Sequence, residues 1–287
     1  EGLWEHHAPT TPGGLRGVLC RLLETARVKP CFGVRVDGVV VRGEEVHVKG
    51  TARKSCANAD VGTTVSQFSE FLEVYDCVVF CIPAPDVLEI KGLQKYLSSE
   101  SLHVLKNVRY DRRMCEAHFF SEKMRPALKA LMQRNVEMKV NDINNKLQYI
   151  AWQDQKWYHG ISERNPSPPC AVVVHGPPDC SLEPLGDALD STLSSLTGMA
   201  ANDIAACRVF SKTIPWKVAQ MVTPMEAVVG NPPTAPLWQC LVGGNGKIVL
   251  AGDFMTHSSY LGCIASADAA ARAVVKTMIC HRTEVVT

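Results

Sequence analysis

Two short, uninterrupted apolar runs constrain the fold of this chain more than any other feature. The first, Tyr75–Ile82, stops at a Pro-Ala-Pro sequence, and the second, Lys247–Ala251, stops at Gly252 and Asp253. Apolarity that is continuous rather than alternating is typical of strands buried on both faces, as in a parallel sheet. An alanine-rich stretch with apolar residues at helical spacing, Ile264–Met278, follows the second run. This order of strand, turn and helix predicts an α/β fold.

The remaining segments predict a second kind of structure. Helical spacing predicts a helix over 14–27, and β-branched residues predict a hairpin meander with strands at 31–41 and 45–48. In the middle of the chain, strand-like pieces surround one long helix pattern at Pro184–Leu196. These pieces are His103–Tyr110, Cys115–Phe120, Glu137–Val140, Lys146–Trp152, Ala171–His175 and Arg208–Ile214. The mixture predicts an α+β insertion with a mostly antiparallel sheet.

Composition excludes several classes of partner. The chain has 30 Lys and Arg residues against 29 Asp and Glu residues, a net charge of +1, so it lacks the basic surface that binds nucleic acid or an anionic membrane. No apolar run approaches the roughly 18 residues of a membrane-spanning helix. The 12 cysteines include no C-x-x-C pair and no Cys/His cluster at zinc-finger spacing. We therefore expect free thiols, no metal site, no nucleic-acid or membrane partner, and an intracellular protein, cytoplasmic or organellar.

The end of the second apolar run is the best candidate for a ligand site. The carboxyl ends of strands in open α/β sheets are where ligands bind. Gly252 lets a ligand approach the backbone, and Asp253 can accept hydrogen bonds from sugar-like hydroxyls. Gly262 permits close contact at a helix N-terminus, which favours an anion or an electron-rich ring edge. The alternative is that Gly252 and Asp253 form only a turn and that Gly262 only packs.

Three stretches carry a resemblance to a known family. The stretch Lys247–Val275 contains Gly-Asp-Phe, then Tyr-x-Gly-Cys-Ile and Ser-Ala, and it resembles the C-terminal FAD-binding segment of the flavin amine oxidase superfamily. Renalase-like oxidoreductases are the members to which it is most similar. Asp76–Leu88 resembles the strand of that family that is followed by Pro-x-Pro and an acid near the flavin, and Phe32–Val41 resembles the strand that lies against the adenosine.

The resemblance implies an FAD cofactor and a division of the chain into three segments. Residues 1–95 and 236–287 would together form an incomplete Rossmann-like FAD-binding domain, and residues 96–235 would form a substrate-type domain. The resemblance implies hydride transfer from a carbon–nitrogen centre or a dihydronicotinamide of a small-molecule substrate to the flavin, with reoxidation by dioxygen. It identifies no catalytic residue. The implied cofactor-binding residues are Val36, Pro83, Gly252, Asp253, Phe254, Tyr260, Leu261, Gly262 and Cys263, and the implied substrate-cavity residues are Tyr110, Trp152 and Trp216.

The sequence departs from that family at one important feature. It contains no G-x-G-x-x-G, and its Gly-rich segment Val242–Lys247 precedes a strand instead of following one. The first residue is Glu rather than Met, so an upstream segment is expected to supply the missing strands of the sheet. Two alternatives remain, which are a protein partner that completes the sheet and a degenerate, non-catalytic fold that serves as a structural or interaction subunit. A nicotinamide-only dehydrogenase is disfavoured because it too would need the glycine fingerprint.

Overall fold

The computed structural model describes residues 14–53, 68–131, 137–139, 146–153, 170–223 and 239–284. It is 39% helical and 33% strand, so the chain combines helices and strands as expected. The chain forms two compact units: unit 1 contains Glu1–Pro30 and Asp111–Ala219, and unit 2 contains Cys31–Tyr110 and Gln220–Thr287. No helix in the described part of the chain is both long and apolar enough to cross a membrane.

Unit 2 begins with an antiparallel meander of three strands. Its strands are β1 (Val34–Arg42), β2 (Glu45–Arg53) and β3 (Phe68–Tyr75). Gly43 has a φ of 55° in the tight turn between β1 and β2, and a bulge at Asp37 interrupts the pairing of these two strands. The predicted hairpin is therefore confirmed. The third strand was not predicted because most of its residues face solvent and give no buried pattern.

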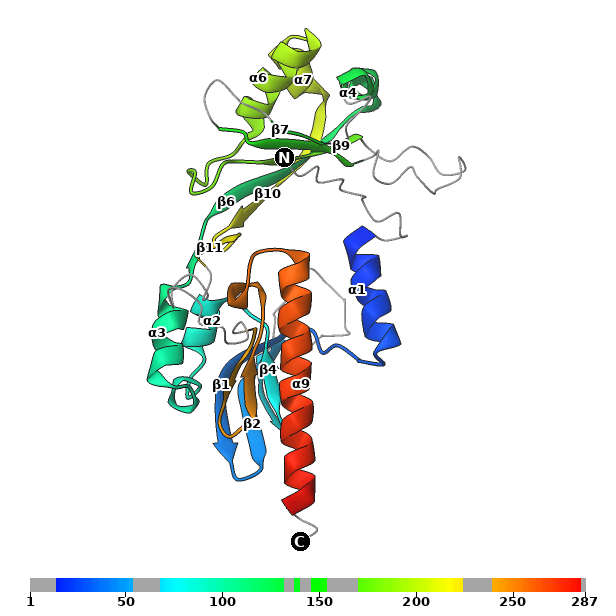
Figure 1. Cartoon of the computed structure of the whole chain (residues 1–287). Helices are drawn as coiled ribbons and strands as arrows, with labels where there is room; N and C mark the ends of the chain where they lie inside the picture. Colours follow the sequence, from blue (N-terminus) through cyan, green and yellow to red (C-terminus); the bar gives the residue numbers. More distant parts are fainter. Residues whose placement is uncertain are drawn as a thin grey trace. The chain divides into compact units, whose positions relative to one another are not determined.

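The two apolar runs of the sequence form neighbouring strands of a second sheet in unit 2. Its order is β12 (Leu241–Gly243), β13 (Ile248–Leu250) and β4 (Val78–Phe80), and β13 pairs with β4 in parallel. Phe80, Ile248 and Leu250 lie in the larger hydrophobic core of the unit. On the other side, Val249 and Ala251 pack against Ala270 of the long helix α9 (Tyr260–Glu284), which runs along this sheet in Figure 1. The expected parallel strands and the expected helix after them are confirmed.

Shorter elements complete unit 2. They are α2 (Ala84–Glu89), η1 (Gln94–Tyr96), α3 (Ser99–Asn107), β5 (Arg109–Tyr110), β11 (Met221–Thr223) and η3 (Asp253–Met255). The predicted strand over His103–Tyr110 is wrong, because most of that segment belongs to α3 and only its last two residues are extended. The helix is favoured because Ser98 accepts a hydrogen bond from the N–H of Ser101 at its start, and because Val104 and Leu105 are buried.

Unit 1 is built on a five-stranded sheet with helices on one face. The strand order is β10-β6-β9-β8-β7, and every pairing is antiparallel, as expected. The strands are β6 (Arg113–Phe120), β7 (Glu137–Lys139), β8 (Tyr149–Trp152), β9 (Cys170–His175) and β10 (Arg208–Trp216). The helical elements are α1 (Gly14–Thr25), η2 (Glu122–Met124), α4 (Arg125–Leu131), α6 (Gly186–Thr197) and α7 (Ala201–Cys207). Figure 1 shows α4, α6 and α7 on the same side of the sheet, where the second hydrophobic core lies.

Candidate functional site

The turn after β13 is held in a conformation that requires glycine. Gly252 has φ 152° and ψ −178°, a region of backbone space that is essentially restricted to glycine. A Cβ atom at this position would lie 2.9 Å from the ring of Phe254. The N–H of Gly252 donates to Oγ of Ser266 at 2.9 Å, and this hydroxyl donates in turn to the carbonyl of Gln239 at 2.6 Å. The turn is therefore fixed to α9 at the carboxyl end of the parallel strands.

The two residues after Gly252 have different roles. Asp253 is half-buried and accepts a hydrogen bond from Oγ of Ser258 at 3.1 Å. A carboxylate has about four lone-pair positions, so Asp253 can accept further hydrogen bonds from ligand hydroxyls. Phe254 is only 1% exposed and lies in the larger hydrophobic core. Its ring packs in the core beside the turn and is therefore not accessible to a ligand.

The first turn of α9 is closed by a serine. Ser259 accepts a hydrogen bond from the N–H of Gly262 at its Oγ, at 3.1 Å, and one from the N–H of Cys263 at its carbonyl, at 3.0 Å. A Cβ atom on Gly262 would lie 2.3 Å from the carbonyl oxygen of His257. The close packing considered for Gly262 is therefore present, and its N–H group already has a partner within the chain.

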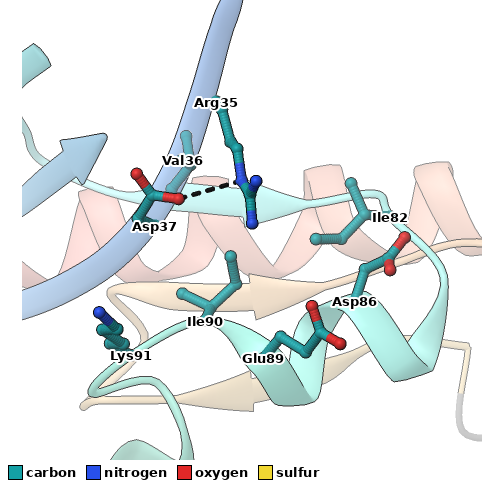
Figure 2. A pocket seen from close by; sticks show the side chains of 8 residues that line it. All are labelled: Arg35, Val36, Asp37, Ile82, Asp86, Glu89, Ile90 and Lys91. Carbon is teal, nitrogen blue, oxygen red and sulfur yellow. Dashed lines mark ion pairs between the residues drawn. The ribbon is translucent and has the colours of Figure 1, made fainter. Parts of the chain in front are cut away.

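A cavity of about 400 Å³ lies beside β1 and α2 (Figure 2). Figure 2 shows the guanidinium of Arg35 between Asp37 and Ile82, and its Nε lies 3.1 Å from Oδ1 of Asp37. Among the described residues, the carboxylates of Asp86 and Glu89 have no ion-pair partner. The lining combines apolar walls with charges of both signs, and it consists of Arg35, Val36, Asp37, Ile82, Asp86, Glu89, Ile90 and Lys91.

Two residues expected at a cofactor site are placed at or next to this cavity. Val36, on β1, lines it directly. Pro83 follows the lining residue Ile82, and its carbonyl accepts the N–H of Val87 where α2 begins. Pro83 therefore sets the direction of the chain as it turns from β4 into α2, which carries the carboxylate of Asp86 into the cavity wall.

Tyr110 connects this region electrostatically with the Gly252 turn. Its hydroxyl accepts a hydrogen bond from the N–H of Ala84 at 3.3 Å. Burial raises the pKa of Tyr110 to about 12, and the charges of Asp253 and Asp86 act in the same direction. Asp86 lies two residues after Ala84 on α2, and β11, which pairs with β5, contacts the 3₁₀ helix η3 that begins at Asp253. Tyr110 therefore keeps its proton at neutral pH and can donate a hydrogen bond.

The other aromatic residues expected near a substrate are dispersed. Trp152 lies in the hydrophobic core of unit 1, 5% exposed, and its indole N–H finds no hydrogen-bond partner among the described residues. Trp216 is the last residue of β10 and is 51% exposed. Tyr260 and Leu261, which begin α9, are exposed, as is Cys263. Within unit 2 the structure thus brings together Tyr110, Asp253 and the cavity region, whereas both tryptophans belong to unit 1.

Several residues of this region were not identified as site residues from the sequence. Ser266 is completely buried and fixes the Gly252 turn, and the signal for it in the sequence is the Ser-Ala pair of the family resemblance. Arg35 and Lys91 bring positive charge to the cavity but belong to no recognisable motif. Among the described residues, no group of three or more His, Cys, Asp or Glu side chains is arranged to hold a metal ion.

Comparisons with known proteins leave the function to be argued from this geometry. Neither a search of protein-family models nor a search of curated proteins finds a match for this chain. The features that bear on function are therefore the glycine-only turn, the carboxylate that follows it, and the charged cavity beside β1 and α2.

Proposed function

We propose that unit 2 binds FAD and that the chain is an FAD-dependent oxidoreductase similar to the flavin amine oxidases. The observation that carries this proposal is the position of Gly252. It takes a glycine-only conformation at the carboxyl end of the parallel strands β4 and β13, and Asp253 and the start of α9 follow it. Ligands of open α/β sheets bind at this edge, where a backbone without a side chain can approach them closely.

The cavity beside β1 and α2 is the proposed binding site for the adenosine end of FAD. The free carboxylates of Asp86 and Glu89 can accept hydrogen bonds from ribose hydroxyls or from an exocyclic amine. Ile82 and Ile90 offer apolar surface to a flat ring, and Lys91 offers a positive charge for a phosphate. A volume of about 400 Å³ is within the range of small-molecule sites.

The residues of the chain would hold and orient the cofactor. When bound, FAD would supply the redox chemistry, which is acceptance of a hydride by the flavin and reoxidation of the flavin by dioxygen. The hydride would come from a carbon–nitrogen centre or a dihydronicotinamide of a small-molecule substrate. Asp253 would accept hydrogen bonds from the hydroxyls of the cofactor. Tyr110, whose pKa is raised to about 12, would remain a neutral hydrogen-bond donor near Asp253 and Asp86.

Titration with FAD tests the proposal directly. We expect the protein to bind FAD with a shifted visible spectrum and quenched flavin fluorescence, and we expect Asp253→Ala to weaken binding about 10-fold or more, since hydrogen bonds to charged groups contribute about 1.5–3 kcal/mol. Asp268→Ala is the matched control, because Asp268 is an exposed residue on α9 that pairs with Arg272. A protein that stays colourless throughout the titration would rule out the flavin proposal.

One observation favours a second candidate, a non-catalytic structural or interaction subunit. Among the described strands, β4 pairs with β13 and has no partner on its other edge. Val79 in this strand is 42% exposed although parallel strands are usually buried. A strand from an upstream segment or from a protein partner could add to this edge through backbone hydrogen bonds. Failure to bind FAD, together with a stable complex formed through β4, would support this candidate.

A further inference from the structure

A second cavity of unit 2 lies at the opposite end of the parallel strands from the Gly252 turn. Its volume is about 380 Å³, and its lining comes from the start of β2, the end of β3, the residues just before β4 and the second half of α9. Cys77 in the lining directly precedes β4, whereas Gly252 lies just beyond the end of the parallel strand β13. None of the described lining residues belongs to the proposed FAD site, so a role for this cavity stands independently of the proposed function.

One wall of this cavity is apolar and fixed in place. Val274 and Met278 lie four residues apart on α9, so they share one face of the helix, and both are half-buried. Val274 and Cys77 also pack against the small hydrophobic cluster between α9 and β13. Val74 and Tyr75, at the end of β3, are 47% and 45% exposed. A ligand that carries an apolar group therefore gains by covering these side chains.

The charged residues described in the lining are all acidic. Glu45 and Asp76 contribute two carboxylates, and the described lining contains no lysine, arginine or histidine. Oε2 of Glu45 lies 3.2 Å from Nε2 of His47, whereas no ion pair with another described residue engages the carboxylate of Asp76. The cavity therefore attracts positive charge, and Asp76 is its principal anionic group.

A lysine next to the cavity is already paired with another carboxylate. The carbonyl of Lys247 accepts the N–H of Val78, which places this lysine beside Cys77 in the paired strands. The side chain of Lys247 is only 5% exposed, and its ammonium forms an ion pair with Glu44. Burial raises the pKa of the Cys77 thiol, although the charge of Lys247 acts in the opposite direction, so this thiol is uncharged at neutral pH. Neither residue offers a charge to a ligand.

The combination of groups favours an organic cation over a metal ion. A cation within about 6 Å of an aromatic ring is attracted to the face of that ring, and Tyr75 is the neighbour of Asp76 in the chain. Met278 adds a flexible thioether that adapts to apolar groups of different shape. Among the described residues, no group of three His, Cys, Asp or Glu side chains is arranged to hold a metal ion. An organic cation uses both the carboxylate and the apolar wall.

We propose that this cavity binds a small amphipathic organic cation, which is a primary or quaternary amine that carries an apolar group. The charged nitrogen pairs with Asp76 at the rim, and Glu45 and the ring of Tyr75 add to its attraction. The apolar group lies against Val274 and Met278, where it covers surface that otherwise faces water. Because Asp76 is exposed, the attraction weakens as the ionic strength rises.

A titration of the full chain with three benzyl compounds tests this proposal. The methionine methyl groups are labelled with carbon-13, and the signal of Met278 is assigned from its loss in Met278→Leu. Benzyltrimethylammonium, benzyl alcohol and phenylacetate present the same benzyl group with positive, zero and negative charge. We expect benzyltrimethylammonium to shift the Met278 signal saturably, because its ring lies against this methyl group. Benzyl alcohol should bind about 5-fold more weakly, and phenylacetate should cause no shift.

Two matched variants identify the carboxylate that is responsible. Asp76→Asn keeps the size of the side chain and removes its charge, so we expect it to weaken the binding of benzyltrimethylammonium about 3-fold or more. Glu73→Gln removes the same charge from an exposed position of β3 outside the described lining, and it should change the affinity by less than about 2-fold. Higher ionic strength should weaken the binding of benzyltrimethylammonium but not that of benzyl alcohol.

Three results would overturn the proposal without the use of any variant. Equal binding of the three compounds would show an apolar cavity without preference for charge. Tighter binding of phenylacetate would show an anion site, and a Met278 signal that no compound shifts would show that the cavity admits none of them. An unchanged affinity in Asp76→Asn would overturn the proposal as well. The titration requires no FAD, so its outcome leaves the test of the proposed function unaffected.

Discussion

At the scale of single residues, glycine is needed at position 252 for two separate reasons. The φ and ψ angles there are open essentially to glycine alone, and the ring of the buried Phe254 occupies the space of a Cβ atom. Gly43 also has a positive φ, of 55°, but no atom lies within 4 Å of the place that a Cβ atom would take there. A side chain at position 252 would therefore meet both crowding and a forbidden backbone conformation. A side chain at position 43 would meet only the strain of a left-handed turn.

We expect Gly252→Ala to lower the free energy of unfolding by about 3 kcal/mol and Gly43→Ala by about 1 kcal/mol. Urea unfolding followed by circular dichroism measures both values under identical conditions. Equal losses in the two variants would show that the crowding by Phe254 is relieved without cost.

A second prediction at this scale concerns the buried hydroxyl of Ser266. Ser266→Ala leaves the N–H of Gly252 and the carbonyl of Gln239 without the partner that joins them. An unsatisfied buried polar group costs about 1–3 kcal/mol, so we expect a loss of this size in the free energy of unfolding. Ser195→Ala, at an exposed position within α6, is the control and should change stability by less than about 0.5 kcal/mol. Similar losses in both variants would contradict the role given to Ser266.

At the scale of elements, the sequence predicted best those strands that lie within short apolar runs. The strands β4 and β13 consist only of apolar residues, whereas β3 is largely exposed and carries no comparable pattern. The segment His103–Tyr110 was mistaken for a strand because its valines suggested β structure, and burial of one helical face outweighed that preference. The cavity could not be predicted, because its lining comes from β1 and α2, which are separated by other strands in the chain.

The packing of β6 against α6 and β10 buries a histidine, His118, that makes unit 1 sensitive to acid. Nε2 of His118 lies 3.0 Å from Oε2 of Glu116, and both side chains are almost fully buried. Oε1 of Glu116 accepts the hydroxyl of Thr213, and Arg208 of β10 pairs with Asp190 of α6. Burial and the charge of Arg208 lower the pKa of His118, while Glu116 and Asp190 act in the opposite direction.

The sign of the resulting pH dependence follows from linkage. The folded pKa of His118 lies below its unfolded value of about 6.5, so the unfolded chain binds a proton that the folded chain does not. Stability is therefore complete above pH 6.5 and falls as the pH drops toward the folded pKa, by up to about 1.4 kcal/mol per pH unit. The pKa of Asp190 is raised by burial, which opposes this trend only at more acidic pH.

We expect the free energy of unfolding to decrease between pH 7.5 and pH 5.5 in the wild type and to change less in His118→Gln. Urea unfolding at a series of pH values measures this slope. His103→Gln is the matched control, because His103 lies outside unit 1 on α3. An unchanged slope in His118→Gln would show that another group takes up the proton.

At the scale of the whole molecule, the chain leaves and re-enters unit 2 at neighbouring points. Tyr110 of β5 pairs with Met221 of β11, and the N–H of Ala219 donates to the carbonyl of Asp111 at 3.0 Å. The intervening residues, Asp111–Ala219, belong entirely to unit 1. The ends of that segment are therefore close enough to be joined by a short linker.

We expect a chain in which a short Gly-Ser linker replaces Asp111–Ala219 to keep unit 2 folded, with a cooperative thermal transition observed by circular dichroism. A deletion of equal length that begins at Ser101 cuts into α3 and serves as the control. Loss of the cooperative transition in both deletions would show that unit 2 depends on unit 1 for its stability.

The pairing of β4 with β13 also determines when unit 2 can fold during synthesis. The thiol of Cys77, beside β4, donates a hydrogen bond to the carbonyl of Gly246, beside β13, and these residues are 169 positions apart in the chain. Ribosomes add about 5–20 residues per second, so β4 waits roughly 10–30 s for its partner strand to emerge. Phe80 and its apolar neighbours face water during this interval, while the residues of β6 to β10 are already available to fold. The apolar residues of β4 can therefore be buried against their partner strand only after β13, the last of the described strands, has been synthesised.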